Sequence, residues 1–349
     1  MNLMGMFAKG NEFVENLKPT DKVILVHHKD ADGSYSATIA LIALKRLGKK
    51  ISKVVTGTTE KSDEILKAIK NYKKVIIVDI GIDLLFKDLN ALDKEILYID
   101  HHLPVDDELN DRIVYINPRL ERNDIYQPAT YLVYKFFSQL VDITDKEWLA
   151  VIGTIGDYGY EDCRDLLDKY IKVNDKREMW KTKYGKAVIE TVGAATEIGF
   201  DNLVDILVAV DSFEELVKNK KIKTVYKNYL KKYNDVKKMF WKNAERFNEV
   251  NLIFSVLSSN VERVGSAIVT ETSTKYPDKI IFLLEKIDDF YKIHARYQKG
   301  KINLGLLLRE MGVGGGHGPA AGGKISIKDL SSFKEKLIGK LKAFLERIS

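Results

Sequence analysis

The sequence predicts an α/β protein with an N-terminal doubly wound parallel sheet, a helical linker and a smaller α/β C-terminal domain. Short β-branched runs alternate with helix-length amphipathic segments over roughly residues 20–160, a pattern typical of parallel sheets. A lysine-rich helical stretch follows, and strand-like runs return from residue 251. We therefore expect three parts, at 1–165, 166–250 and 251–349.

Length and composition narrow the class of protein. The 349 residues are enough for two domains with a core in each. The net charge of +6 permits a phosphate-bearing substrate without requiring one. A single cysteine, Cys163, excludes an internal disulfide framework and a cysteine zinc site, as in a reducing cytoplasm. The apolar patch at 1–9 is too short for a signal peptide or a membrane span, so we expect a cytoplasmic protein without a membrane partner.

The N-terminal elements are predicted from short, β-branched strand runs and amphipathic helical periods between them. We expect helices at 11–18, 34–47, 60–72, 84–92, 128–141 and 145–153, and strands at 22–26, 53–56, 74–78, 95–99 and 114–118. Open α/β sheets bind their ligands beyond the carboxyl ends of the strands. Polar side chains at those ends are therefore the candidates for a functional site.

Metal-competent side chains do follow these strands. Asp100, His101 and His102 come directly after the strand at 95–99. All six histidines of the chain lie within a few residues of a candidate motif; they are His27, His28, His101, His102, His294 and His317. Scattered structural histidines would not be expected to do that.

The turn after the first strand holds a second acidic cluster. Asp30 and Asp32 are two residues apart and are preceded by His27 and His28. An Asx turn in which Asp32 caps the next helix would explain one aspartate. We favour metal ligation because the pattern His-x-Asp-x-Asp-Gly follows a buried strand.

Two more aspartates extend the pattern. Asp79 ends the buried strand at 74–78, where a carboxylate is costly unless it is paired or bound to a metal; the alternative is a helix N-cap. Asp157 lies between Gly156 and Gly159, which suggests close backbone approach at a crowded site. A plain loop is the alternative there, and we favour a ligand in both cases.

The helical part from about 165 to 250 is rich in lysine and aromatic residues, most strongly basic at 218–232. Such a stretch can form a nucleic-acid groove, but it is more often a solvated helix face with extended lysines. We favour the solvated face and expect a linker between domains.

The C-terminal part is predicted to have strands at 252–257, 279–284, 291–296 and 324–327, with helices at 302–311 and 328–348. His294 and Arg296 are two apart and should share one face of a strand. The glycine-rich stretch 312–323 would expose backbone N–H groups to a phosphate. It lacks the Gly-Lys-Ser/Thr ending of a Walker loop. Flexibility is the alternative, and we favour substrate binding because His317 lies inside the run.

Together these motifs resemble the DHH phosphoesterase superfamily, in the branch with a DHH-associated C-terminal domain. The matching residues span about 22–325 in family order; they are His28 to Gly33, Asp79, Asp100-His101-His102, Gly156-Asp157, Gly314 to His317 and Ala320 to Gly322. Members of this branch include RecJ-like exonucleases, nanoRNases and cyclic di-AMP phosphodiesterases.

The resemblance implies two Mn²⁺ ions, or Mg²⁺, in a cleft between the domains. His28 and Asp30 would hold one ion. Asp32, His101 and Asp157 would hold the other, and Asp79 would bridge. His27 is an alternative to His28, which is favoured because it is in phase with Asp30 and Asp32.

The remaining motif residues acquire roles from the same resemblance. His102 would face the scissile phosphate and Asp100 would orient a neighbouring histidine. Arg296, Gly314, Gly315, Gly316 and His317 would bind the substrate phosphate or nucleotide.

The expected activity is a manganese-dependent phosphodiesterase that hydrolyses single-stranded or short oligonucleotides to nucleoside monophosphates. A cyclic di-AMP phosphodiesterase is the second enzymatic hypothesis, and a replication-complex binding subunit is the hypothesis of another class. Expected partners are single-stranded nucleic acid, a short oligonucleotide or a cyclic dinucleotide. A second copy of the chain and replication or repair proteins are compatible with the resemblance.

Overall fold

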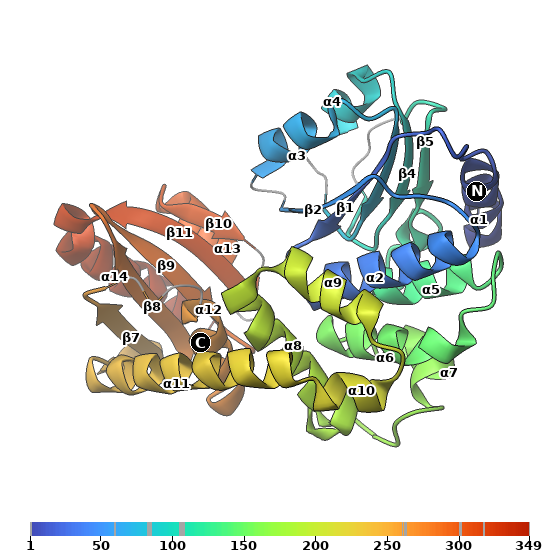
Figure 1. The fold of residues 1–349 in the computed structure, drawn as a ribbon. Coiled ribbons are helices and arrows are strands. Elements are labelled where there is room, and N and C mark those ends of the chain that lie inside the picture. The colour runs from blue at the N-terminus through green and yellow to red at the C-terminus, as the bar shows by residue number, and fades with distance from the viewer. Residues whose placement is uncertain are drawn as a thin grey trace. The chain divides into compact units, whose positions relative to one another are not determined.

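The computed structural model divides the chain into two compact units, Met1–Lys227 and Asn228–Ser349 (Figure 1). It describes residues 2–58, 61–81, 86–104, 109–259, 261, 264–299, 302–316 and 318–348. Among these residues, no helix combines the length and hydrophobicity needed to cross a bilayer.

The first unit is built on a five-stranded sheet in the order β2-β1-β3-β4-β5, and every neighbouring pair is parallel. Its strands are β1 (Val23–His28), β2 (Lys53–Gly57), β3 (Lys74–Val78), β4 (Glu95–Ile99) and β5 (Ile113–Ile116). β3 is buried along its whole length, as the uninterrupted apolar run predicts. The predicted parallel sheet is therefore confirmed, with shifts of a few residues at the strand ends.

Helices cover both faces of this sheet (Figure 1). The helices on the two faces are α1 (Leu3–Glu15), α2 (Ala31–Arg46), α3 (Ser62–Ile69), α4 (Phe86–Ala91) and α5 (Ala129–Phe137). Alternate residues of β1 enter different cores, since Leu25 packs with the α2 and α5 side and Ile24 with the α3 and α4 side. This alternation is what a strand covered on both faces requires.

The helical region after residue 146 departs from the expected linker at 166–250. It contains α6 (Glu147–Gly156), α7 (Arg164–Leu167), α8 (Lys183–Ile198), α9 (Phe200–Ala209), α10 (Phe213–Lys218) and α11 (Lys220–Lys242). Buried residues of α8 to α10, such as Val188 and Leu203, belong to the large core of the first unit. Only α11 crosses the boundary between the units. The apolar faces of α8 to α10 explain the difference, because they complete a core instead of spanning a gap.

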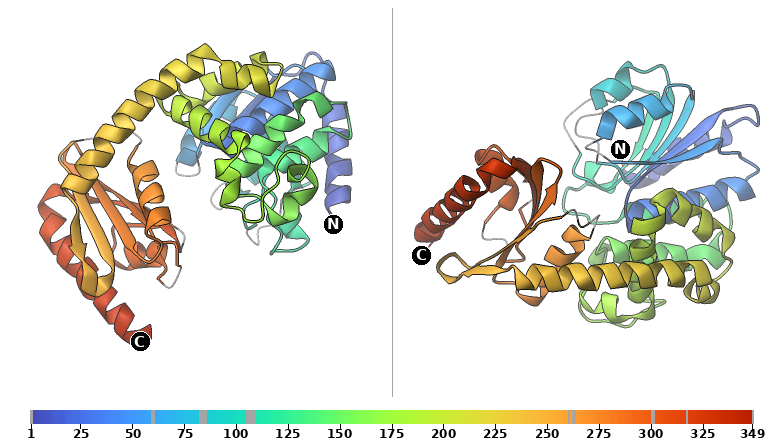
Figure 2. Two further views of the ribbon diagram at one scale, coloured as in Figure 1. Left: turned by 90° about the horizontal axis from the view of Figure 1, so that it is seen from below. Right: turned by 60° about the vertical axis from the view of Figure 1, so that its left-hand side comes forward.

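The second unit is a smaller α/β unit with a six-stranded sheet in the order β10-β11-β9-β8-β7-β6. Only the β7–β8 pair is parallel. Its elements are β6 (Glu245–Phe247), β7 (Leu252–Leu257), α12 (Gly265–Lys275), β8 (Ile280–Ile287), β9 (Phe290–Arg296), α13 (Leu304–Glu310), β10 (Gly314–Gly316), β11 (Ala320–Ser326) and α14 (Leu330–Ile348). Figure 2 shows α14 along this sheet from two further directions.

The glycine-rich stretch differs from the expected loop. Gly314, Gly315 and Gly316 form β10 and pair with β11, which starts at Ala320 and not at Lys324. Gly316 has φ = 139°, and a Cβ there would lie 2.5 Å from the carbonyl oxygen of Ala320. Close backbone pairing therefore accounts for part of this glycine run.

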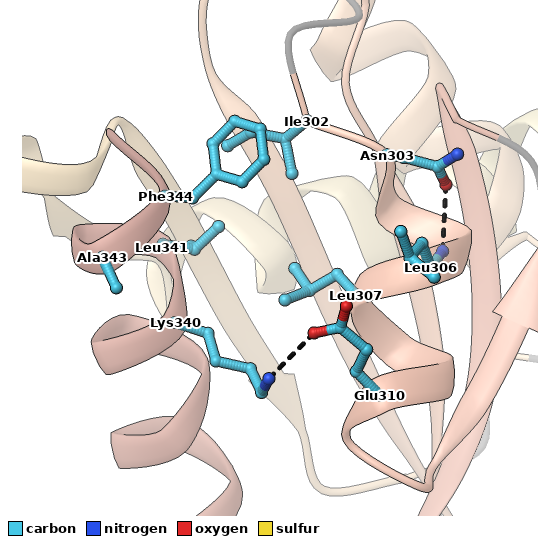
Figure 3. Close-up of a pocket in the computed structure, with 9 residues that line it drawn as sticks. All are labelled: Ile302, Asn303, Leu306, Leu307, Glu310, Lys340, Leu341, Ala343 and Phe344. Carbon is cyan, nitrogen blue, oxygen red and sulfur yellow. Dashed lines mark hydrogen bonds and ion pairs between the residues drawn. The ribbon is translucent and has the colours of Figure 1, made fainter. Parts of the chain in front are cut away.

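An apolar hollow of about 330 Å³ lies within the second unit, between α13 and α14 (Figure 3). Its only carboxylate, Glu310, is paired with Lys340 at 2.9 Å between Oε2 and Nζ. The other lining residues are Ile302, Asn303, Leu306, Leu307, Leu341, Ala343 and Phe344. This lining lacks the donor set that a divalent cation needs.

The packing of α6 against α5 provides a stability test. A Cβ on Gly153 would lie 2.6 Å from Cγ2 of Thr130, so Gly153→Ala should overpack this contact and lower the free energy of unfolding by about 1–3 kcal/mol. Gly339 in α14 has open space around it, so Gly339→Ala should raise stability by about 0.5–1 kcal/mol. Urea denaturation followed by circular dichroism measures both, and equal effects would contradict the contact.

Candidate metal centre

The candidate residues gather at the carboxyl edge of the parallel sheet. His28 is the last residue of β1, Asp79 follows β3, and Asp100 follows β4. The backbone N–H of Asp79 donates to the carbonyl of Ile99 at 3.0 Å, which ties the ends of β3 and β4 together. The parallel register thus brings residues far apart in sequence to one edge.

The first group of donors is His28, Asp30 and Asp79, whose ligand atoms all lie within 4.8 Å of one another. His28 Nδ1 lies 2.6 Å from Oδ2 of Asp30 and 3.8 Å from Oδ2 of Asp79. The other oxygen of Asp30 accepts from the Gly33 N–H at 2.9 Å and caps α2. The oxygen of Asp30 that caps α2 is therefore not the one that faces His28.

The second group is Asp32, His101 and Asp157, again within 4.8 Å. Nε2 of His101 lies 3.7 Å from Asp32 Oδ2 and 3.4 Å from Asp157 Oδ2. It also lies 3.3 Å from Oδ1 of Asp79. The two oxygens of Asp79 consequently face different groups, as a bridging carboxylate would.

The choice between His27 and His28 follows from strand geometry. Adjacent residues of a strand point to opposite faces, and His27 points away from the acidic cluster. Its Nε2 lies 3.4 Å from Asp201 on α9, and its Nδ1 lies 2.8 Å from the carbonyl of His28. Only His28 is placed beside Asp30 and Asp79.

The buried carboxylate of Asp32 is positioned by α5 and not by its own helix. The backbone N–H groups of Ala129 and Thr130 each donate to it at 2.7 Å, and the Thr130 hydroxyl also donates to it. Asp30, and not Asp32, is the cap of α2. The N-terminus of α5 thus stabilises the carboxylate of Asp32. Oδ2 of the same carboxylate also faces His101.

Asp100 and His102 are hydrogen-bonded to each other next to the two groups of candidate metal ligands. Oδ1 of Asp100 lies 2.8 Å from Nδ1 of His102, and its Oδ2 accepts from the Tyr98 hydroxyl at 2.8 Å. Asp100 is buried, whereas the His102 side chain is 41% exposed. The contact between Nδ1 and the buried Asp100 fixes the orientation of the His102 ring, and part of the side chain remains exposed to solvent.

The electrostatics of the cluster show an excess of negative charge. Burial, with the charges of Asp157 and Asp30, raises the pKa of Asp32 to about 8. Burial and the surrounding carboxylates also raise the pKa of Asp79 well above its usual value. Burial lowers the pKa of His101 to about 4, so that this ring is a neutral donor at pH 7.

The residues present fit divalent cations. Oδ2 of Asp79 and Nδ1 of His101 are buried without a hydrogen-bond partner in the described structure, although buried polar atoms are rarely left so. Carboxylates and neutral imidazoles suit Mn²⁺, and carboxylate-rich sites also admit Mg²⁺. A cation would compensate the charge that raises the pKa values of Asp32 and Asp79.

Sequence reasoning missed two polar residues of this site. The Tyr126 hydroxyl donates to Oδ2 of Asp157 at 2.5 Å, and Nδ2 of Asn117 donates to the carbonyl of His102 at 2.8 Å. Asn117 follows β5, so the strand-end pattern could have identified it. Tyr126 lies in an irregular segment and carries no comparable sequence signal.

The expected substrate-binding residues lie in the second unit. Arg296 and His294 both face α12, since Arg296 Nη2 lies 3.3 Å from Ser266 Oγ and a Cβ on Gly265 would lie 2.9 Å from the His294 ring. His294 Nε2 also lies 2.9 Å from Oε1 of the buried Glu285. Arg296 pairs in register with Ala320 of β11, while His317 lies outside the described residues.

Solved structures share this fold at low sequence identity. RecJ of Thermus thermophilus in complex with Mn²⁺ has a TM-score of 0.74 and 17% identity, over 97% of this chain and 54% of that one. This chain thus spans about half the length of that RecJ. CDC45 of Entamoeba histolytica has a TM-score of 0.65 and 12% identity, over 99% of both chains. The pGpG-specific phosphodiesterase PggH of Vibrio cholerae has a TM-score of 0.58 and 15% identity, over 92% of this chain and 99% of that one.

Sequence comparison gives the family directly. None of the curated proteins matches the chain significantly. The family model for the DHH family, N-terminal domain, matches residues 22–154, and the model for the DHHA1 domain matches residues 249–343. The carboxylates and histidines of the two donor groups lie within the first match, apart from Asp157 just beyond its end. The chain therefore belongs to the DHH family and carries a DHHA1 domain in its C-terminal part.

Proposed function

We propose that the chain is a metal-dependent phosphodiesterase that hydrolyses single-stranded or short oligonucleotides to nucleoside monophosphates. The position of Asp79 carries the proposal. One of its oxygens faces His28 and the other faces His101, so that one carboxylate adjoins both donor groups. Two such groups sharing a carboxylate are the arrangement of a two-metal hydrolytic site.

Mn²⁺ ions, with Mg²⁺ as the alternative, would be held by His28, Asp30 and Asp79 in one group and by Asp32, His101 and Asp157 in the other, with Asp79 shared. Bound there, two ions would supply an activated water and charge compensation for the attacking and leaving oxygens. Neutral His101 presents a lone pair at pH 7, and Asp32 is held in place by α5. The protein thus contributes a donor set whose geometry is fixed by several elements.

His102 is the group best suited to contact the phosphate. Burial would lower its pKa, but the hydrogen bond and charge of Asp100 raise it to about 9. The ring is therefore cationic at pH 7 and partly exposed beside the cluster. Asp100 acts as a positioning residue, and Arg296 with Gly314–Gly316 and His317 would bind the nucleotide.

Two other functions remain candidates. A cyclic di-AMP phosphodiesterase would use the same donors, and the likeness to the pGpG-specific phosphodiesterase PggH is compatible with a substrate as short as a dinucleotide. A binding subunit of a replication complex is the remaining hypothesis. Such a subunit would not need the complete set of ligand atoms that this chain retains.

A product assay with Mn²⁺ distinguishes the three. End-labelled oligonucleotides of two to about twenty residues are compared with cyclic di-AMP. Release of nucleoside monophosphates from oligonucleotides supports the proposal, and turnover of cyclic di-AMP alone supports the second function. A protein that binds Mn²⁺ but hydrolyses neither substrate would contradict both enzymatic readings.

Replacing Asp79 should abolish the metal-dependent reaction. Asp79→Asn keeps the size and tolerates the left-handed backbone at this position (φ = 59°) while removing the shared charge. We expect turnover with Mn²⁺ to fall by at least about 100-fold, because even outer residues of metal sites cost 10–100-fold. Asp63→Asn, on the exposed face of α3, is the matched control. Near wild-type turnover in Asp79→Asn would defeat the assignment.

Stability should depend on metal and pH together. The pKa of Asp32 is raised to about 8, so the folded metal-free protein keeps a proton that the unfolded chain loses above about pH 4. This group therefore makes the metal-free protein less stable as pH rises from about 4 to 8. Metal binding needs the ionised form. The rise in Tm on adding Mn²⁺ should be larger at pH 8 than at pH 5.5, as measured by calorimetry, and absent in Asp79→Asn.

The pair of Asp100 and His102 predicts a pH profile. If cationic His102 contacts the phosphate, activity should fall as pH rises past about 9. Asp100→Asn removes the charge that raises the His102 pKa, so the alkaline limb should move down toward pH 6.5, the ordinary range for histidine. The exposed Asp88→Asn in α4 is the control. An unmoved limb in Asp100→Asn would assign the alkaline pKa to another group.

A further inference from the structure

Helix α11 concentrates the positive charge of the chain. Its 23 residues hold nine lysines and one acidic residue, a formal charge of +8, whereas the whole chain carries +6. The rest of the chain is therefore slightly acidic, at −2. A basic surface on an otherwise acidic chain is the electrostatic footprint of a polyanion site.

The lysines are arranged in one row. Six exposed lysines follow one another at spacings of three or four residues, with exposed Asn234 in the remaining position; they are Lys220, Lys223, Lys227, Lys231, Lys238 and Lys242. We call this set the lysine row. Residues so spaced lie on one face of a helix, and at 1.5 Å per residue the row is about 33 Å long.

The opposite face of α11 is already used in packing. Ile222, Tyr229, Val236 and Phe240 are buried, and Ile222 belongs to the core of the first unit. The helix consequently has no free apolar face to insert into a lipid surface. This distinguishes the lysine row from a membrane-binding amphipathic helix.

An ordinary solvated helix does not account for the row. Stable exposed helices interleave acidic and basic residues, and like charges four apart repel each other. Lys223, Lys227 and Lys231 are such repelling neighbours, and the one acidic residue of the helix, Asp235, lies 3.9 Å from Lys238. The row therefore costs helix stability in the free protein, and a bound polyanion would offset that cost.

An aromatic side chain flanks the row. A surface hollow of about 540 Å³ is lined by Asn234, Lys237, Lys238 and Trp241. The Trp241 ring makes T-shaped contacts with Phe240 and Tyr276. The guanidinium of Arg246 lies 5.7 Å from the centroid of this ring, so a base stacked on the ring would displace Arg246 or share the ring with it. Lysines that follow a backbone and an aromatic ring on which a base can stack are the two components of single-strand binding sites.

We propose that the lysine row of α11 binds the phosphate backbone of a single-stranded nucleic acid, with a base stacked on Trp241. The row would accommodate roughly ten stacked nucleotides at 3.4 Å each. This site does not depend on the proposed hydrolysis, because none of its residues belongs to the metal centre.

Binding is measured by fluorescence anisotropy with a labelled single-stranded 20-mer in EDTA, so that hydrolysis plays no part. The variant carries Lys223→Gln, Lys227→Gln, Lys231→Gln and Lys238→Gln. The matched control removes the same charge at four exposed lysines outside α11, with Lys9→Gln, Lys50→Gln, Lys67→Gln and Lys70→Gln. Unchanged far-ultraviolet circular dichroism verifies that both variants fold.

In the variant, the slope of the logarithm of the binding constant against the logarithm of the salt concentration should become less steep by about 3, because each lost phosphate contact changes it by about 0.7. In the control, the slope should stay near that of the wild type. Trp241→Leu should weaken binding at least about fivefold without changing the slope. Equal slopes in variant and control would overturn the proposal, as would tighter binding to a duplex or to phosphatidylserine vesicles than to the single strand. If the lysine variant shows the expected shallower slope but the wild-type protein hydrolyses no substrate, the binding site on α11 is upheld and the proposed function is rejected.

Discussion

The structure of the first unit depends on how the carboxylates at the sheet edge are compensated. Asp32 and Asp79 are both 1% exposed and face other acidic groups. A buried carboxylate is stable only if it is protonated, hydrogen-bonded or paired with a cation. Asp32 has backbone donors from α5, but one oxygen of Asp79 has none among the described residues. Burial and the neighbouring carboxylates therefore favour protonated forms of Asp32 and Asp79 in the metal-free fold, and a bound cation would take the place of those protons.

The backbone around Asp79 is consistent with that cost. Asp79 has φ = 59°, a left-handed conformation that costs a non-glycine residue about 1–3 kcal/mol. Aspartate is one of the few residues that tolerate this region. The conformation turns the chain at the end of β3 and directs the carboxylate between His28 and His101. Backbone strain and a buried oxygen without a hydrogen-bond partner among the described residues thus coincide at the residue that adjoins both donor groups, as is common at functional sites.

The sequence allowed the parallel sheet and the clustering of acidic turns to be predicted because both follow from local patterns. Uninterrupted apolar runs such as β3 identify buried strands, and the carboxyl ends of parallel strands meet at one edge. The preference for His28 over His27 rested on phase, and strand alternation in the structure places His28 beside Asp30. Contacts made across long sequence separations could not be read in this way. The bonds of Asp32 to Ala129 and Thr130 depend on where α5 begins, nearly one hundred residues later.

The helical segment and the glycine run show the same limit. An apolar helix face identifies a buried surface but not the core to which it belongs, so α8 to α10 resembled a linker although they complete the first unit. Glycines in a sequence likewise indicate that another group comes close to the backbone, but they do not identify that group. At Gly316 that group is the Ala320 carbonyl, and at Gly265 it is the His294 ring. A glycine can thus be required by the fold and still lie in a ligand site, so sequence alone does not separate the two roles.

The distribution of charge bears on how an anionic substrate could use such a centre. An acidic cluster repels a phosphate until cations are bound, and the cationic His102 beside the cluster offsets this repulsion. The basic excess of the chain lies instead on α11, among solvent-exposed lysines. Attraction of a polyanion and compensation of charge at the reacting phosphate are thereby assigned to different residues. Under the two proposals, separating these roles would let the acidic cluster hold cations while a chain of phosphates is attracted to α11.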